Sequence, residues 1–100
     1  MSRRSEMLRD QREALYYDQL GFCATCHYGM SLESAELAHK IPEAKWAVKK
    51  YGFPVVDHVL NKAMTHRGYC NDQQLIQNRP AECDQLAAEI RKEIERESKR

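Results

Sequence analysis

The stretch Cys23-Ala24-Thr25-Cys26-His27 has the residue types and the spacing of a metal or cofactor site. Two thiols three positions apart can hold a metal ion as one half of a structural zinc site. The same stretch, with a histidine directly after the second cysteine, also has the spacing of a c-type haem attachment site. It therefore predicts either a zinc knuckle or a haem site.

The rest of the chain favours zinc over haem. Haem attachment is chemistry of exported proteins, and the N-terminal segment MSRRSEMLRDQREALYYDQL has no apolar core of signal-peptide length. A haem would also need a second axial ligand, for which Met30 or Met64 could serve. No stretch approaches a membrane span, so we expect a cytoplasmic protein that makes no membrane contact. In that reducing compartment, four cysteines indicate a metal before disulfides.

A tetrahedral zinc site needs two further ligands from cysteine or histidine. His66 and Cys70 lie four residues apart in THRGYCND, where the glycine allows a turn that brings both side chains inward. Cys83 is the alternative ligand, but it lies on the apolar stripe of the last expected helix, where a free cysteine is usually a small core residue. The predicted zinc ligands are Cys23, Cys26, His66 and Cys70, and Cys83 remains an alternative to one of the second pair.

Length and composition are those of a single small folded domain spanning residues 1–100. Apolar residues make up 42% of the chain and charged residues 31%, which is typical of a folded protein. A chain of 100 residues has a modest core, so a structural metal would be a natural supplement. The net charge of +1 gives no support by itself to nucleic-acid binding.

Helices are expected at both ends of the chain. Residues 5–19 read as a helix that Gly21 would end, so residues 1–20 form an N-terminal helical segment. Residues 80–98 are the clearest helix, because apolar residues recur at helical spacing while charges fill the opposite face. Between these helices, residues 21–78 are expected to form the metal-bound core.

The core shows weaker patterns. Residues 42–52 predict a short helix between Pro42 and Gly52, with Trp46, Val48 and Tyr51 as its candidates for burial. Residues 33–41 do not distinguish strand from helix, and the Val-rich stretch 53–66 predicts extended structure or loop. One or two helical turns are expected after Cys70, with Asn71 or Asp72 as the cap.

Three further residues suggest a family. His39 in ELAHKIP, Asn61 in HVLN and Asn71 in CND lie in the order and approximate spacing of the HNH endonucleases, the ββα-metal nucleases, which residues 20–78 resemble. In zinc-bound members, two Cys/His pairs flank two short strands and lead into a helix. The resemblance implies an α+β fold, with a small ββα-metal (His-Me finger) core held by zinc and flanked by the N- and C-terminal helices.

The resemblance also implies a function, which is metal-dependent hydrolysis of DNA phosphodiester bonds by an endonuclease or nickase. His39 would be the general base that activates water, since a neutral imidazole accepts a proton near neutral pH. Asn71 would hold a catalytic Mg²⁺ or another divalent cation on the scissile phosphate, and Asn61 would fix the loop and orient His39. His58 would join the site as a second metal ligand or a phosphate contact. The expected partner is double-stranded DNA.

One position departs from the family pattern. Many members have an aspartate or histidine before the catalytic histidine, where it binds the catalytic metal, whereas this chain has Ala38. The alternative hypothesis is therefore a non-catalytic zinc-binding module that docks nucleic acid or a protein partner. That module would need the zinc ligands but neither His39 nor a second metal.

Overall fold

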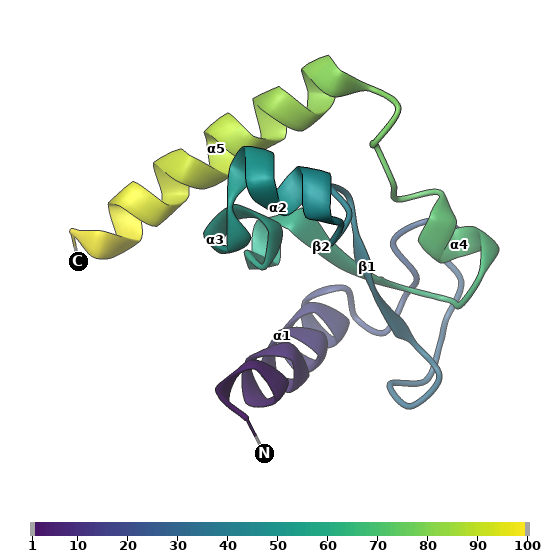
Figure 1. Cartoon of the computed structure of the whole chain (residues 1–100). Coiled ribbons are helices and arrows are strands. Elements are labelled where there is room, and N and C mark those ends of the chain that lie inside the picture. The colour runs from purple at the N-terminus through teal and green to yellow at the C-terminus, as the bar shows by residue number, and fades with distance from the viewer. Residues whose placement is uncertain (1, 100) are drawn as a thin grey trace. The chain divides into compact units, whose positions relative to one another are not determined.

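Helices precede, separate and follow two short strands along this chain (Figure 1). The structure is a computed structural model and describes residues 2–99. β1 and β2 pair in a two-stranded antiparallel sheet, so the predicted α+β class is confirmed. In chain order the elements are α1 (Arg3–Asp18), β1 (Glu36–His39), α2 (Lys45–Tyr51), α3 (Phe53–Val56), the 3₁₀ helix η1 (Val59–Asn61), β2 (Lys62–Thr65), α4 (Tyr69–Asp72) and α5 (Pro80–Ser98).

The residues gather into two compact units, each made of two separate stretches of chain. The first unit contains residues 2–38 and Ala63–Gln74, and so includes α1, α4 and most of both strands. The second unit contains His39–Lys62 and residues 75–99, and so includes α2, α3, η1 and α5.

α1 is the N-terminal helix that the sequence predicts. The Ser2 side chain caps its first turn by accepting a hydrogen bond from the Ser5 N–H. The helix ends before Leu20 and Gly21, which both have positive φ angles (57° and 77°). Gly21 suits this position because a residue without a Cβ adopts that conformation at little cost.

None of the residues of α1 is buried. Polar contacts attach the helix to the rest of the first unit. The Arg12 guanidinium donates to the carbonyls of Leu32 and Ala35, each at 3.0 Å. The Gln19 side chain pairs with the backbone of Met64, donating to its carbonyl at 2.8 Å and accepting from its N–H at 2.9 Å. Side chains thus satisfy backbone groups that would otherwise need water.

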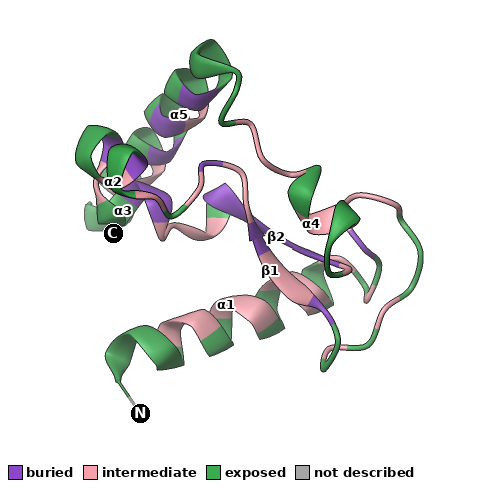
Figure 2. Ribbon diagram, turned by 45° about the vertical axis from the view of Figure 1, so that its right-hand side comes forward, coloured by how far each residue is buried: buried purple, intermediate pink, exposed green. Residues whose placement is uncertain are grey.

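The second unit has an apolar core. α5 buries Cys83, Ala87 and Ile90, which lie three and four residues apart and therefore share one helix face, coloured purple in Figure 2. The remaining buried members of this cluster are Ile41, Ala47, Tyr51, Val55 and Val56. The amphipathic pattern predicted for residues 80–98 is thus confirmed.

Three expectations for the middle of the chain are wrong. Residues 53–61 are not extended, because Pro54 stands in the first turn of α3 and η1 follows, so that only Lys62–Thr65 forms a strand. Trp46 is not buried, since it keeps 45% of its surface exposed. Neither Asn71 nor Asp72 caps α4, because the helix begins at Tyr69 with Gly68 as its N-cap residue.

Candidate metal centre and candidate active site

The four predicted zinc ligands come together in the first unit. The ligand atoms of Cys23, Cys26, His66 and Cys70 all lie within 4.8 Å of one another. Cys23 and Cys26 lie in the segment that the Phe22–Gly29 bridge closes. His66 directly follows β2, and Cys70 is the second residue of α4. Three thiols and one imidazole are a donor set that tetrahedral Zn²⁺ prefers, so this cluster fits a zinc ion.

Hydrogen bonds to the Cys23 sulfur favour its thiolate form. Burial alone would raise the pKa of Cys23, but backbone N–H groups of Cys26, His66 and Thr25 lower it to about 6, with help from the His66 side chain. The N–H groups of Thr25 and His66 each lie 3.4 Å from this sulfur. Since the thiolate is the form that binds metal, these donors favour the metal-binding state.

The His66 ring is oriented to use Nδ1 as the ligand atom. Nε2 lies 3.2 Å from the Gly29 carbonyl oxygen, which can only accept, so Nε2 carries the proton. Nδ1 then has a free lone pair and lies 3.3 Å from the Cys26 sulfur. A backbone carbonyl that fixes the tautomer of a ligating histidine is a common outer contact of zinc sites.

Cys70 is the thiol of the cluster that a cation would affect most. Burial, followed by the neighbouring Cys26 and Cys23 sulfurs, raises the pKa of Cys70 to about 11. Several thiolates cannot lie this close together without a positive charge between them. A zinc ion would remove that repulsion, and its binding would release protons.

Thr25 joins the two halves of the cluster through hydrogen bonds. Its hydroxyl donates to the Cys70 carbonyl at 2.7 Å and accepts from the Gln74 side chain at 2.8 Å. The two ligand pairs are therefore held together by protein contacts as well as by any metal.

Cys83, the alternative ligand, is not part of this cluster. It belongs to the second unit, where it is buried in α5 and its thiol donates to the Ile76 carbonyl at 3.2 Å. Burial raises its pKa, as expected for a neutral core thiol. His27 is exposed and also lies outside the cluster.

In the second unit, Asn61 fixes the loop that follows β1. Its fully buried carboxamide accepts from the Ile41 N–H at 2.8 Å and donates to the carbonyls of Ile41 and Val56, each at 2.9 Å. A carboxamide offers one acceptor and two donors, and all three are used here. The loop-fixing contacts expected for Asn61 are therefore present, while its part in catalysis stays a prediction.

Two carboxylates that the sequence reading did not single out lie beside His39, the last residue of β1. The ligand atoms of His39, Glu43 and Asp57 are all within 4.8 Å of one another. The buried Lys62 ammonium lies 3.9 Å from Asp57 Oδ1. Exposed acidic residues are common, so nothing in the sequence marks these two; the Pro42–Val56 stretch had to fold back for them to meet.

The other predicted site residues lie elsewhere. His58 accepts from the Leu60 N–H through Nδ1 at 3.1 Å, so Nε2 carries the proton that faces Glu97 Oε1 at 3.0 Å. Both ring nitrogens therefore have protein partners, which favours a structural role for His58. Asn71 lies in α4 and belongs to the first unit, whereas His39, His58 and Asn61 belong to the second.

Comparison with known proteins does not assign a family. No family model matches the sequence, no curated protein resembles it closely enough to count as a match, and no solved structure matches the fold. Among residues 2–99, no helix combines the length and apolar character that crossing a membrane would require.

Proposed function

We propose that this protein is a metal-dependent DNA endonuclease or nickase of the ββα-metal type, in which zinc has a structural role. The observation that carries the proposal is the Asn61 carboxamide, whose three hydrogen bonds hold the loop two residues after His39. A general base must be held in position to act on a substrate, and this contact restrains the chain next to the imidazole.

His39 is the proposed general base. It would take a proton from the water that attacks the phosphorus atom, while the bond from phosphorus to the leaving 3′ oxygen breaks. Glu43 and Asp57 can orient the ring and stabilise its protonated form, because both carboxylates lie within 4.8 Å of a ring nitrogen. Proton transfer to a positioned side chain accounts for roughly 10²–10⁴-fold of rate in enzymes.

The cation would stabilise the charge that develops on the phosphate and on the leaving oxygen. Mg²⁺ prefers oxygen ligands and retains several waters, so few protein ligands are needed. Ala38 provides no ligand at the position that the family uses, but Glu43 and Asp57 offer carboxylate oxygens near His39.

A non-catalytic zinc-binding module is the second candidate. The cluster of Cys23, Cys26, His66 and Cys70 supports it, because this donor set is complete without any residue of the second unit. The two candidates differ in what they require of His39.

Cleavage of supercoiled plasmid tests the proposal. Zinc-loaded protein with Mg²⁺ or Mn²⁺ is expected to nick the plasmid, and His39→Ala should lower the rate by about 100-fold or more. Omitting the added cation is a better control than a chelator, since a chelator would also remove zinc. Asn61→Asp, which keeps the acceptor but loses both donors, should be slowed less than His39→Ala.

His27→Asn is the matched control. His27 is an exposed histidine with a φ angle of 66°, a conformation that asparagine tolerates. This variant should cleave at the wild-type rate. Equal cleavage by His39→Ala with unchanged zinc content would overturn the assignment of His39 as the general base. Absence of cleavage by the zinc-loaded wild-type protein would instead support the non-catalytic module.

A further inference from the structure

A hollow lies on the surface of the second unit, next to the candidate active site. Its volume is about 390 Å³, which is within the range of small-ligand sites. It is lined by two residues before α2, three residues of α2 and the first residue of α3: Glu43, Ala44, Lys45, Val48, Lys49 and Phe53. Glu43 also belongs to the cluster around His39, so the hollow adjoins that cluster.

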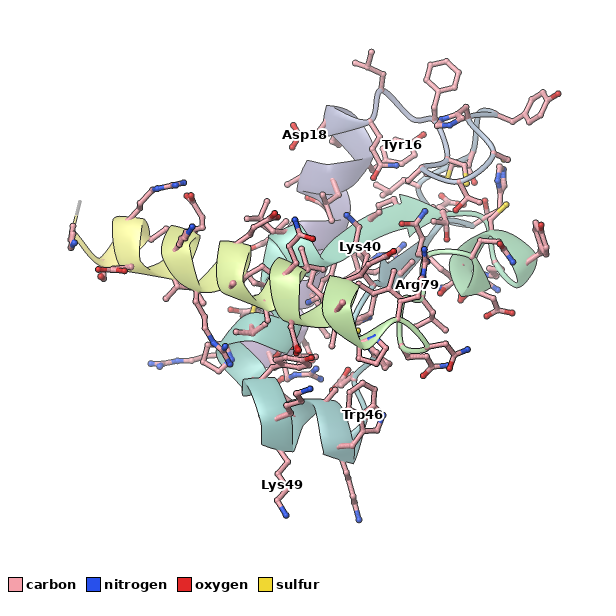
Figure 3. All side chains as sticks on the ribbon, turned by 90° about the horizontal axis from the view of Figure 1, so that it is seen from above. Tyr16, Asp18, Lys40, Trp46, Lys49 and Arg79 are labelled. Atoms are coloured by element: carbon pink, nitrogen blue, oxygen red, sulfur yellow. The ribbon has the colours of Figure 1, made fainter. Side chains whose placement is uncertain are left out.

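Two lysines add positive charge to the lining of the hollow. Lys45 and Lys49 stand one turn apart on α2, and neither forms an ion pair with any residue in the range 2–99. Lys50 on the same helix differs, because its ammonium lies 3.2 Å from Asp84 Oδ1. Figure 3 shows Lys49 projecting away from the helix into solvent. Unneutralised ammonium groups beside a hollow suit an anionic ligand.

An aromatic ring completes the lining. Phe53 is 50% exposed although it is large and apolar, and Trp46 on α2 also projects outward (Figure 3). Val48 adds an apolar wall that is partly packed against the core. Aromatic faces next to cationic groups are the combination by which proteins hold unpaired nucleotides, with the base stacked and the phosphate bound by charge.

We propose that this hollow binds one unpaired nucleotide of a DNA strand. Its phosphate contacts Lys45 and Lys49, and its base stacks on Phe53. This inference rests on the proposed nuclease function and sharpens it, because the substrate becomes DNA with an unpaired segment near the scissile bond.

Binding can be measured separately from cleavage. Zinc-loaded protein without added Mg²⁺ is titrated into a fluorescently labelled single strand, a blunt duplex of the same sequence, and a duplex with a single-stranded overhang. Fluorescence anisotropy should show that the single strand and the overhang bind at least tenfold more tightly than the blunt duplex. Equal affinities for all three would overturn the proposal.

Variants locate the binding to the hollow. Lys45→Ala combined with Lys49→Ala should weaken binding of the single strand at least tenfold and reduce its dependence on salt, because two phosphate contacts are lost. Alanine keeps the helix intact at these exposed positions. Lys92→Ala, at an exposed lysine of α5, is the matched control and should bind as wild type does.

Variants of Phe53 provide a second, independent test of the proposal. Phe53→Leu keeps most of the apolar volume but removes the ring face, and should weaken binding about fivefold or more. Phe53→Tyr should restore it. If both lysine and Phe53 variants bind as Lys92→Ala does, the hollow does not hold DNA, and sedimentation would then show whether a second copy or a protein partner occupies it.

The two proposals fail in different ways. A protein that binds single strands through the hollow but cuts nothing would disprove the nuclease function alone. If the protein nicks plasmid in a His39-dependent manner but the lysine variants bind DNA normally, only the proposed nucleotide binding in the hollow would be disproved.

Discussion

The two units of this protein are stabilised by different means. The second unit buries a cluster of aliphatic and aromatic side chains, including Ile41, Val56 and Ile90. The first unit buries mostly small residues, such as Ala35 and Ala38, and gathers a cluster of metal ligands. One short chain thus combines an apolar core with a cluster of side chains whose types and spacing fit a zinc ion.

This comparison also separates the candidate functions. A zinc ion held by Cys23, Cys26, His66 and Cys70 would help to order the first unit, and this role needs no catalytic chemistry. His39 and its neighbouring carboxylates lie in the second unit, which also contains the apolar core. Loss of zinc should therefore affect the folding of the first unit, whereas loss of the His39 imidazole should affect the proposed cleavage activity.

The largest expected effect comes from Cys70→Ser. A serine hydroxyl is a poor zinc ligand, so the zinc content should fall from about one ion per chain to near zero. Zinc binding in small domains supplies on the order of 10 kcal/mol of folding free energy, so the first unit should lose its structure. Metal analysis and amide hydrogen exchange, followed separately for the two units, measure both effects.

Cys83→Ala is the matched control for that change. It removes a buried thiol from the second unit, so it should lower stability by about 1–2 kcal/mol while zinc content stays the same. If Cys83→Ala lost zinc and Cys70→Ser kept it, the assignment of ligands would be wrong.

An intermediate effect is expected from Ile90→Ala. Ile90 is fully buried in the apolar cluster of the second unit, and deleting such a side chain costs about 2–5 kcal/mol in free energy of unfolding. Zinc content should not change. Urea denaturation measures the loss, with Lys92→Ala as a surface control expected within about 0.5 kcal/mol of wild type. A loss as small as that of the control would show that this cluster does not stabilise the unit.

The smallest expected effect comes from Tyr51→Phe, which removes one hydrogen bond to Asp84 in the second unit. The Tyr51 hydroxyl donates to Asp84 Oδ1 at 2.6 Å, and this bond, followed by Lys50, lowers the pKa of Asp84 from its ordinary 3.8. Removing the hydroxyl should raise the pKa of Asp84 toward that value.

NMR titration of the Asp84 carboxyl measures this shift. Because the pKa is depressed in the folded protein, the charged carboxylate contributes stability above pH 3.8, and the contribution is lost as the pH falls through the folded value. An unchanged pKa in Tyr51→Phe would assign the effect to Lys50 alone.

Local chemistry in the sequence determined several features. The amphipathic spacing predicted α5, and Gly21 agrees with the end of α1. The paired spacings selected the four residues that cluster as a candidate metal site. These features depend on residues close together in the chain, or on ligand types that are rare enough to be recognised.

Only the tertiary structure decided the rest. Glu43 and Asp57 are ordinary surface-type acids in the sequence, and their approach to His39 depends on how the chain between them folds back. The helical turns at residues 53–61 were misread because valine-rich stretches favour strands, whereas burial of Val55 and Val56 in the core favours helix here. Side chains that meet across a loop leave no fixed spacing in the sequence, so their contacts exist only once the loop is closed.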